Sequence, residues 1–365
     1  MWYSKEKSSK HDGIVKEKKM KRTVAVITPK GEVVARRQDV PELLENEVLI
    51  DVEVSLISPG TEMNVPRARR QKPEGKDMMF GYANAGTIIK TKGNVKDLKV
   101  GMRVAAMGGG KAIHGSIACV PVNLVVPIPD EVTFEQAAYA CLGVTAMQGV
   151  RRAEVSLGSY GMVLGLGIVG NLACQLFQAS GARVIGWEGY PERIKIAKKC
   201  GIANAVNFKK ADAVAVTREF CAPYGADFAM LAFGGSATPA LQSAMSCMKV
   251  SSDGHAMGNI VLIGGCKVEV GGGAWSGNLD FRASSRTGAG YHDHDWEYGK
   301  DYPNAFIQFS TQRNLHEFVR LLAEKRVKVD PLTTHRIYIK DVGDAADLLL
   351  DHPDKAVGVI LKMKK

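Results

Sequence analysis

The sequence lacks the features that mark membrane, fibrous and secreted proteins. Its 365 residues contain no uninterrupted apolar run close to the roughly 20 residues that a membrane helix needs. With 14 prolines and 39 glycines it is also too poor in both for a collagen-like or Pro-rich disordered chain. The first residues hold no apolar core with a small-residue cleavage site, so we expect no secretory signal and a cytoplasmic location. At roughly 150 residues per domain, a soluble globular chain of this length predicts two domains.

Paired cysteines are also missing. The seven cysteines are scattered, and the closest two, Cys247 and Cys266, are nineteen positions apart. Without a CxxC pair, neither a zinc knuckle nor a thioredoxin-type redox pair is expected. Scattered cysteines in a chain of this length are typical of small buried side chains in a reducing compartment.

Acidic residues are fewer than basic ones, with 38 Asp and Glu against 48 Lys and Arg, for a formal charge of +10. Residues 1–22 hold eight Lys or Arg against Glu6, Asp12 and Glu17, so this segment carries half of the net charge. We interpret it as a solvated basic tail, with a weak role at an acidic partner or membrane surface as the alternative. Because the rest of the chain is only mildly basic, we expect neither a nucleic-acid nor a membrane partner.

The pattern of apolar residues changes near residue 150. Before it, short strands alternate with turns that contain Gly or Pro; they are 23–28, 48–57, 86–90, 103–106 and 117–120. After it, apolar strands alternate with helices; the strands are 162–164, 183–187, 228–233 and 260–263, and the helices 169–180, 192–200 and 239–248. We therefore expect an α/β protein in which residues 151–290 form a doubly wound parallel sheet. Residues 23–150, completed by a helix at 315–324 and strands at 336–339 and 357–362 within residues 291–365, form a β-rich domain.

A glycine-rich turn opens the second domain. The hexapeptide Gly165-Leu166-Gly167-Ile168-Val169-Gly170 matches G-x-G-x-x-G between a buried strand and a helix. Gly165 permits the tight turn, Gly167 lets the backbone approach a pyrophosphate, and Gly170 lets helix and strand pack closely. The helix amino end supplies free N–H groups for the phosphates. A packing turn in a domain that has lost its nucleotide is the alternative.

An acid follows the next strand of this domain. Glu188 lies twenty-three positions after Gly165, where a carboxylate accepts hydrogen bonds from the adenosine ribose and repels a 2′-phosphate. It predicts NAD rather than NADP, unless Glu188 is a plain surface carboxylate. Thr145 and Gly264 complete the candidate cofactor-binding residues.

The order of these parts resembles the medium-chain dehydrogenase/reductase superfamily over residues 23–365. The resemblance rests on Ser58-Pro59-Gly60-Thr61-Glu62, Gly81-Tyr82-Ala83-Asn84-Ala85-Gly86, Val100-Gly101-Met102-Arg103-Val104, Cys141-Leu142-Gly143-Val144-Thr145-Ala146 and Lys355-Ala356-Val357-Gly358-Val359-Ile360-Leu361. The Ser-Pro-Gly-Thr-Glu segment and the long loop after residue 288 look most like the branch with threonine dehydrogenase-like, sorbitol dehydrogenase-like and bacteriochlorophyllide dehydrogenase-like proteins.

The resemblance implies a GroES-like catalytic domain, a Rossmann domain that binds NAD(P), an active cleft between them, and a homodimer or homotetramer formed through the edge strand of the cofactor domain. It also implies that Arg193, five positions after Glu188, contacts the adenosine ribose.

The sequence departs from the family at its zinc ligands. Zinc-dependent members have Cys, His and Glu where this chain has Pro59, Tyr82 and Ala83. A catalytic zinc needs three protein ligands, and only Cys141 remains at a matching position. The four-cysteine structural lobe is missing too, because the first cysteine is Cys119. We therefore expect no metal, and a packed thiol at Cys141.

Without zinc, hydrogen-bond donors must polarise the substrate oxygen. Thr61 matches the hydroxyl relay position of the family, although a capping hydroxyl in a turn explains it equally well. Tyr82 replaces a metal ligand and can donate its phenol proton, or it fills the vacated space. His114 precedes a strand, in a loop that runs near the substrate in the family, and its pKa range suits proton exchange; a surface histidine is the alternative.

The run Tyr291-His292-Asp293-His294-Asp295-Trp296-Glu297 concentrates metal-ligating side chains. In an extended segment its histidines would face one side and its acids the other. Metal binding, a polar lid over a hydroxylated substrate, and a solvated or oligomer-contact loop all stay open.

These features predict an NAD-dependent, zinc-independent oxidoreductase that interconverts a secondary alcohol and a ketone on a sugar, cyclitol or polyol. An NADPH-dependent enoyl or quinone reductase, and a catalytically silent nucleotide-binding protein, are the alternatives.

Overall fold

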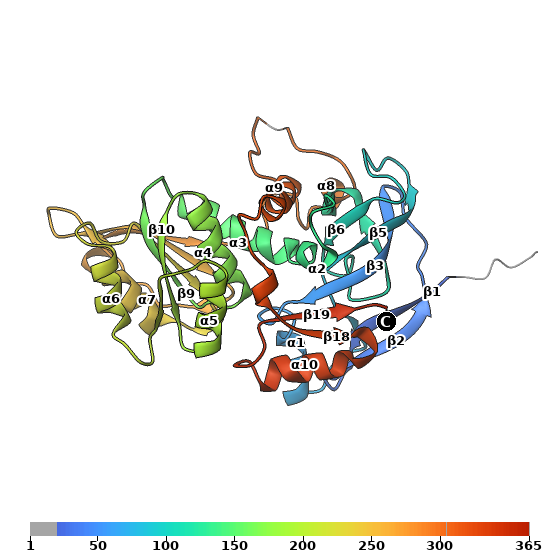
Figure 1. The fold of residues 1–365 in the computed structure, drawn as a ribbon, viewed down its shortest axis with the longest axis horizontal. Helices are drawn as coiled ribbons and strands as arrows, with labels where there is room; N and C mark the ends of the chain where they lie inside the picture. The colour runs from blue at the N-terminus through green and yellow to red at the C-terminus, as the bar shows by residue number, and fades with distance from the viewer. Residues whose placement is uncertain (1–19, 304, 365) are drawn as a thin grey trace, which may run out of the picture.

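The computed structural model describes residues 20–303 and 305–364. Figure 1 shows an elongated molecule of two lobes. One lobe contains the amino-terminal strands together with the carboxy-terminal segment, and the other contains the middle of the chain. The helix α3 (Ala140–Ala153) runs between them. Residues 1–19 of the expected basic tail lie outside the described residues. The strand β1 already begins at Lys21, so the predicted boundary at residue 22 is two residues too late.

The first lobe is built on a mixed seven-stranded sheet. Its strands run in the order β18-β19-β3-β5-β6-β8, and β7 pairs with β3. They are β18 (Thr333–Tyr338), β19 (Gly358–Lys362), β3 (Glu47–Ile57), β5 (Ala83–Lys92), β6 (Arg103–Met107), β8 (Val125–Pro127) and β7 (Ile117–Pro121). The carboxy-terminal β19 pairs antiparallel with β3, so the end of the chain completes the domain that its beginning starts.

Smaller elements cover this sheet. A three-stranded sheet joins β1 (Lys21–Ile27) to β2 (Val33–Asp39) and β4 (Met78–Met79). The helices are α1 (Asn64–Gln71), α2 (Phe134–Ala137), α8 (His294–Glu297), α9 (Thr311–Ala323) and α10 (Val342–Asp351). The short helix α8 lies within the 291–297 segment, for which no helix was predicted, and Asp293 caps it by accepting a hydrogen bond from Trp296 N.

The second lobe has a doubly wound, mainly parallel sheet. Its strands are β9 (Tyr160–Leu164), β10 (Arg183–Glu188), β11 (Ala205–Asn207), β12 (Phe228–Ala232), β14 (Lys249–Val250), β15 (Ala256–Ile263) and β17 (Asn278–Ala283). The parallel order is β11-β10-β9-β12-β15-β17, and β14 is antiparallel. Chain order reverses between β9 and β12, which is where ligands bind in sheets of this kind.

Four helices connect these strands. They are α4 (Ile168–Ala179), α5 (Pro191–Lys199), α6 (Ala213–Phe220) and α7 (Thr238–Met245). Short β13 (Gly235–Ser236) and β16 (Cys266–Lys267) pair outside the main sheet. Within the described residues, no helix is long and apolar enough to cross a membrane.

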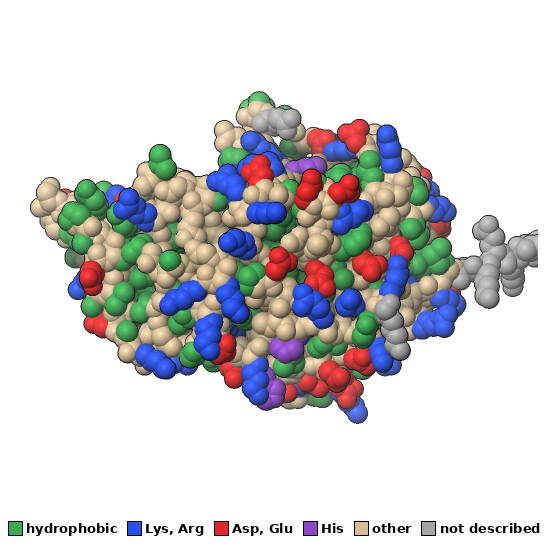
Figure 2. Space-filling view, in the orientation of Figure 1, with side chains coloured by type: hydrophobic (Ala, Val, Ile, Leu, Met, Phe, Trp, Pro, Cys, Tyr) green, Lys and Arg blue, Asp and Glu red, His purple; other side chains and the backbone are tan. Residues whose placement is uncertain are grey.

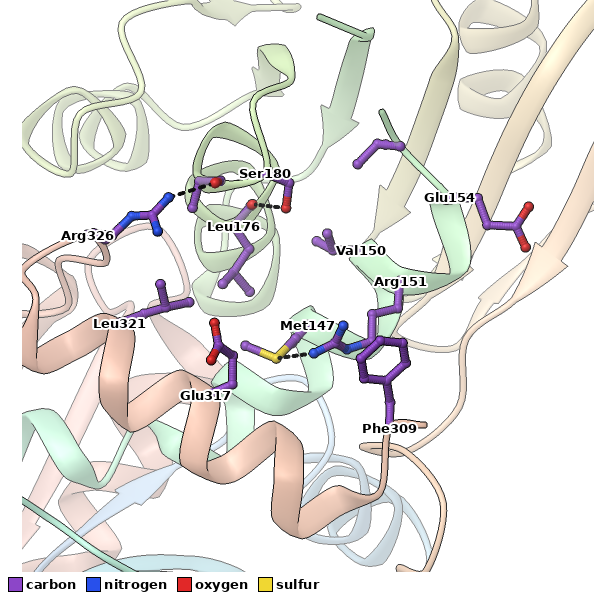
Figure 3. Close-up of a pocket in the computed structure, with 12 residues that line it drawn as sticks. Met147, Val150, Arg151, Glu154, Leu176, Ser180, Phe309, Glu317, Leu321 and Arg326 are labelled. Carbon is purple, nitrogen blue, oxygen red and sulfur yellow. Dashed lines mark hydrogen bonds between the residues drawn. The ribbon is translucent and has the colours of Figure 1, made fainter. Parts of the chain in front are cut away.

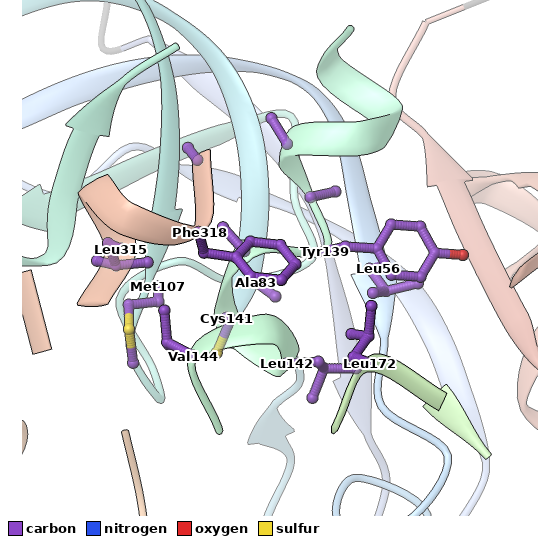
Figure 4. Packing of buried hydrophobic residues seen from close by; sticks show 14 of the residues in the cluster. Leu56, Ala83, Met107, Tyr139, Cys141, Leu142, Val144, Leu172, Leu315 and Phe318 are labelled. Carbon is purple, nitrogen blue, oxygen red and sulfur yellow. The ribbon is translucent and has the colours of Figure 1, made fainter. Parts of the chain in front are cut away.

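The hydrophobic core continues across α3 from one lobe to the other. Figure 4 shows Phe318 of α9 packed in the same cluster as Cys141 and Val144 of α3. A Cβ at Gly143 would lie 2.2 Å from the Phe318 ring, so glycine lets the two helices approach closely. All seven cysteines are free, and five of them are buried, as their scattered spacing predicts.

Basic and acidic side chains are interspersed on the face shown in Figure 2. Many charged side chains of the described residues form ion pairs at the surface, such as Lys96 with Asp301 and Arg336 with Glu135. Exposed pairs of this kind contribute little to stability.

Candidate active site

A cavity of about 540 Å³ lies between the two lobes. The first lobe contributes the loop before α1, Tyr82, and residues of α10 and the segment after it. The second lobe contributes the ends of β9, β12 and β15 and the start of α4, and the loop from Arg286 to His292 lines the same space. Nine predicted site residues line this cavity: Thr61, Tyr82, Thr145, Gly165, Gly167, Ile168, Val169, Arg193 and Gly264.

The glycine-rich turn has the geometry that its spacing predicts. Gly165 has φ +93°, a left-handed conformation that favours glycine. A Cβ at Gly170 would lie 1.8 Å from the Gly165 carbonyl oxygen, so only glycine fits where α4 meets the turn. Gly167 faces the cavity as the N-cap of α4, and no side chain in the described part of the chain caps this helix. The N–H groups at its start are free for a phosphate.

Glu188 is more deeply engaged than expected of a ribose-binding acid. It is 5% exposed, and its carboxylate accepts hydrogen bonds from the N–H groups of Leu166 (3.0 Å), Gly189 (2.7 Å) and Tyr190 (3.1 Å). Like Leu166 and Gly170, it does not itself line the cavity. Glu188 therefore holds the glycine-rich turn on β10 and places one negative charge beside it. The alternative of a plain surface carboxylate is wrong.

Arg193 lies between Glu188 and the cavity. Its Nη1 is 3.7 Å from the Glu188 carboxylate, and its Nη2 donates to the Pro353 carbonyl at 2.7 Å. Its buried Nε has no hydrogen-bond partner within the described part of the chain and is left for a ligand. Arg193 and Lys209 both approach the Tyr190 ring, each 4.9 Å from its centre.

Tyr82 lies at the other end of the cavity, beside Thr61 and Ser58. Burial and the negative charge of Glu62 raise the pKa of Tyr82 well above its usual value, although hydrogen bonds to Ser58 and Thr61 act in the opposite direction. The phenol is therefore a protonated donor at physiological pH. Thr61 is exposed to solvent, so its hydroxyl connects the phenol with bulk water.

His114 lies neither beside the substrate cavity nor on the surface, the two places that the sequence predicted for it. It is fully buried, so it is not a surface histidine, and it is not among the cavity-lining residues, so it does not touch a substrate there. Its Nδ1 is 2.8 Å from Ser55 Oγ, and its Nε2 is 3.2 Å from the Glu62 carboxylate. Glu62 also accepts a hydrogen bond from Ser58 N at 2.7 Å. His114 therefore fixes Glu62, the acid that acts on Tyr82.

The side chains at the expected zinc positions do not fit a zinc ion. Pro59 and Ala83 carry no donor atom, and Cys141 is a buried thiol whose pKa is raised by burial and by Glu62. Among the described residues, no three His, Cys, Asp or Glu side chains come together in a way that could hold a metal. The His and Asp residues of 291–297 likewise form no such group in this part of the chain.

Tyr291 and His292 place one end of the 291–297 segment on the cavity wall. The Tyr291 phenol oxygen accepts a hydrogen bond from Gly109 N at 2.9 Å, and its ring lies against His292 with centres 3.9 Å apart. Burial raises the pKa of Tyr291 to about 12. The rest of the segment turns away into α8.

Sequence reasoning missed three residues of this site. Glu62 lies inside the segment that carries the family resemblance, but it was given no role because its partner, His114, is fifty-two positions away. Arg286 and Arg67 also line the cavity, and no local pattern distinguishes them from other surface arginines. These residues are revealed by contacts in the folded structure, which spacing in the sequence does not show.

A second cavity of about 310 Å³ lies between α3, α4 and α9, and Figure 3 shows it. Its polar groups are satisfied by their neighbours: Arg151 Nε donates to Asn314 Oδ1 at 3.0 Å, and Arg326 Nη2 donates to the Ala179 carbonyl at 2.8 Å. Arg151 also stacks on Phe309, 3.5 Å from the ring centre. This cavity is therefore a gap in the packing, and the arginines on its wall are paired with neighbouring residues.

The chain is similar to known oxidoreductases. A family model described as zinc-binding dehydrogenase matches residues 169–292. The chain is 34% identical over 187 residues to an NADPH-dependent alkenal/one oxidoreductase of Arabidopsis thaliana, which covers 47% of each chain. It is 26% identical over 360 residues to L-threonine 3-dehydrogenase of Rhizobium etli, which covers 89% of this chain and 94% of the relative.

The solved structure of an oxidoreductase/dehydrogenase of unknown specificity from Escherichia coli has the same fold. It matches with a TM-score of 0.76 at 18% identity, over 95% of this chain and all of that one. The chain spans only 47% to 62% of the length of the first curated relatives that it matches. The matched nucleotide domain and a relative that aligns along nearly the whole chain support the medium-chain dehydrogenase/reductase superfamily, and the solved structure shows the same two-lobed fold.

Proposed function

We propose that this protein is an NAD-dependent, zinc-independent oxidoreductase that interconverts a secondary alcohol and a ketone on a sugar, cyclitol or polyol. One observation carries the proposal. A single cavity joins the glycine-rich turn at Gly165 and Gly167 to a protonated phenol at Tyr82, so a dinucleotide and a substrate oxygen fit side by side. The polyol class rests on the resemblance and on the hydroxyl-rich wall of Ser58, Thr61 and Tyr82.

The cofactor fits the second lobe. The start of α4 would hold the pyrophosphate, Arg193 would lie beside the adenosine ribose with the Glu188 charge behind it, and Thr145 and Gly264 line the same cavity. When bound, the nicotinamide supplies the hydride chemistry, so the protein has to orient the substrate and handle one proton.

Tyr82 handles that proton. Its phenol donates a hydrogen bond to the substrate oxygen and stabilises the negative charge that develops there. Thr61 accepts from or donates to the phenol and carries the proton to solvent. His114 is a positioning residue that acts through Glu62 rather than the proton shuttle expected from the sequence.

A reductase that uses NADPH is the second candidate. Lys209 and Arg193 both approach the Tyr190 ring, and these two cations favour a 2′-phosphate. The Glu188 charge opposes them. A silent nucleotide-binding protein is the third candidate, which an intact cavity with a poised donor does not favour.

We also propose a homodimer or homotetramer, as the resemblance implies. In the described part of the chain, β17 pairs only with β15 and leaves one edge of the parallel sheet for a second copy. Light scattering on the purified protein measures this directly.

A substrate screen tests the activity. Purified protein is mixed with NAD and a panel of sugars, cyclitols and polyols, and with NADH and their keto forms, and absorbance of NADH is followed. We expect turnover with at least one secondary alcohol. Cofactor binding without turnover on any alcohol, ketone, enone or quinone would leave the silent protein as the correct assignment.

A further inference from the structure

The interlobe cavity is lined by arginines without acidic counterparts. Arg67, Arg193 and Arg286 line it, and no Asp or Glu does so in the described part of the chain. A neutral polyol needs none of this charge. A cavity lined by charge of one sign attracts ligands of the other sign.

Arg193 is accounted for by the cofactor. A Cβ built on Gly167 would lie 4.0 Å from Arg193 Nη1, so this arginine belongs to the end where the dinucleotide phosphates meet α4. Together with the free N–H groups of that helix, it supplies the positive charge that the cofactor needs.

Arg286 lies on the loop that follows β17. Its Nη1 donates to the Tyr291 carbonyl at 3.3 Å. Arg286 and Tyr291 line the cavity together with Tyr82, the proposed proton donor. Cys141, which also lines the cavity, acts on the pKa of both Tyr291 and Tyr82, so these three side chains lie close together.

The backbone holds Arg286 in place. Its φ is +63°, and His292 has φ +72°, conformations that are costly for residues with a Cβ. The chain on either side is fixed: Ser284 N donates to the Leu262 carbonyl at 2.9 Å, and Thr287 is 2% exposed with its hydroxyl 2.9 Å from Thr311 Oγ1. The Arg286 side chain therefore extends from a left-handed turn in a loop whose backbone is fixed on both sides.

The Arg286 guanidinium has no carboxylate partner among the described residues. Glu297, on the same segment, is buried, and its Oε1 accepts from His292 N at 2.9 Å. Glu62 lies behind Tyr82, paired with His114. Within the described residues, the guanidinium makes one hydrogen bond, to the Tyr291 carbonyl, so four of its five donors are left for a ligand, and their planar fork matches the oxygens of a phosphate or carboxylate.

We infer that the substrate carries an anionic group, a phosphate or a carboxylate, which Arg286 binds while Tyr82 contacts the reacting oxygen. This rests on the proposed function and narrows its substrate class from neutral polyols to their phosphorylated or acidic derivatives. His292 lines the anion subsite next to Arg286.

A binding experiment tests the subsite without turnover. Protein saturated with NADH, which occupies the cofactor phosphate sites, is titrated with inorganic phosphate by isothermal calorimetry. We expect Arg286→Asn to weaken phosphate binding by about fivefold or more, since a charged hydrogen bond is lost. Asparagine tolerates positive φ, so this variant keeps the loop conformation. Arg37→Gln removes an equal charge from the exposed strand β2, outside the cavity, and leaves binding unchanged.

A kinetic experiment identifies the anion. Sorbitol, sorbitol 6-phosphate and gluconate are compared as substrates with NAD. We expect kcat/KM for one anionic form to exceed that of sorbitol at least tenfold, mainly through KM, and Arg286→Asn to remove this advantage. Arg286→Lys, which keeps the charge but loses the fork, retains part of it.

The two experiments separate the two claims. Turnover of sorbitol as efficient as that of both anions, with KM unchanged by Arg286→Asn, overturns the subsite and leaves the oxidoreductase. If no compound is turned over, the proposed activity fails and the phosphate titration alone decides the subsite. Phosphate binding that Arg286→Asn does not weaken overturns it.

Discussion

The two ends of the interlobe cavity are built in different ways. At the cofactor end, the glycine-rich turn, Glu188 and Arg193 come from twenty-nine consecutive residues, 165–193, and are fixed by backbone hydrogen bonds. At the catalytic end, Tyr82, Glu62, His114 and Tyr291 come from four separate segments, and contacts between residues far apart in the sequence fix their positions. The first end is local in sequence, and the second is a product of topology.

This difference predicts how mutations at each end affect cofactor binding and turnover. A change at the cofactor end disturbs a backbone turn and is expected to alter binding of the dinucleotide. A change at the catalytic end disturbs side chains on a rigid scaffold and is expected to alter turnover while binding persists.

The largest effect is expected at Tyr82. Tyr82→Phe keeps the ring and removes only the hydroxyl, so turnover should fall by about 10²-fold or more, the usual scale for a lost acid. NADH affinity should stay within twofold. Steady-state kinetics and NADH fluorescence titration on the same preparation measure the two quantities.

Tyr224→Phe is the matched control, because Tyr224 is 69% exposed and lies outside the cavity. It should match the native protein in both measurements. If Tyr82→Phe also turns over at the native rate, the phenol only fills space, and Thr61 or Tyr291 becomes the candidate donor.

The second effect concerns Glu188 and probes the opposite end. In the native protein, NADH should bind at least tenfold more tightly than NADPH, a difference of about 1.4 kcal/mol. Glu188→Gln removes the charge but keeps one acceptor for the N–H groups of the turn. The ratio of NADH affinity to NADPH affinity should therefore fall towards one. Titration with both cofactors measures it.

Glu192→Gln changes an exposed acid at the start of α5, provides the control, and should preserve the ratio of NADH to NADPH affinity. Equal affinities of the native protein for the two cofactors would favour the NADPH-dependent reductase, with Arg193 and Lys209 as the phosphate ligands.

The third effect is a shift of the pH profile. The charge of Glu62 helps to raise the pKa of Tyr82, so ketone reduction should show no alkaline decline caused by Tyr82 below pH 10. Glu62→Gln removes that charge and lowers the pKa of Tyr82, and the alkaline decline should move to lower pH by about one unit. The profile of kcat against pH measures it.

Glu297→Gln neutralises a buried acid that acts on Tyr291 instead, so its profile should match the native one. An alkaline limb that Glu62→Gln leaves in place would assign that limb to a group other than Tyr82.

Much of the fold could be predicted from the sequence. Strands such as 103–106 and helices such as 192–200 lie within one or two residues of their observed bounds, because apolar period and Pro or Gly boundaries are local signals. No helix was predicted over 291–297, since its alternating His and Asp give no helical period. The side-chain oxygen of Asp293 caps the amino end of α8. A cap depends on one residue, so the hydrophobic period does not detect it.

The candidate site divides in the same way. Gly165, Gly167 and Gly170 could be given roles from their spacing, because the turn conformation is set by neighbouring residues. The place of His114 could not, because its partners Ser55 and Glu62 reach it only through the pairing of distant strands. Arg286 could not either, because its significance is that it faces no carboxylate, which requires the whole cavity to be known.

The smallest effect is expected from metal removal, and it bears on the catalytic end alone. Because Pro59 and Ala83 offer no donor atoms and burial keeps the Cys141 thiol protonated, EDTA should leave turnover unchanged. Protein purified without chelator should hold well below one zinc per chain by elemental analysis. Cys141→Ser should likewise change turnover by less than about threefold, as expected of a packed thiol outside the chemistry. Stoichiometric zinc that is lost together with activity would contradict this assignment. It would also remove the proposed role of Tyr82 as proton donor, because a metal would then polarise the substrate oxygen in place of the phenol.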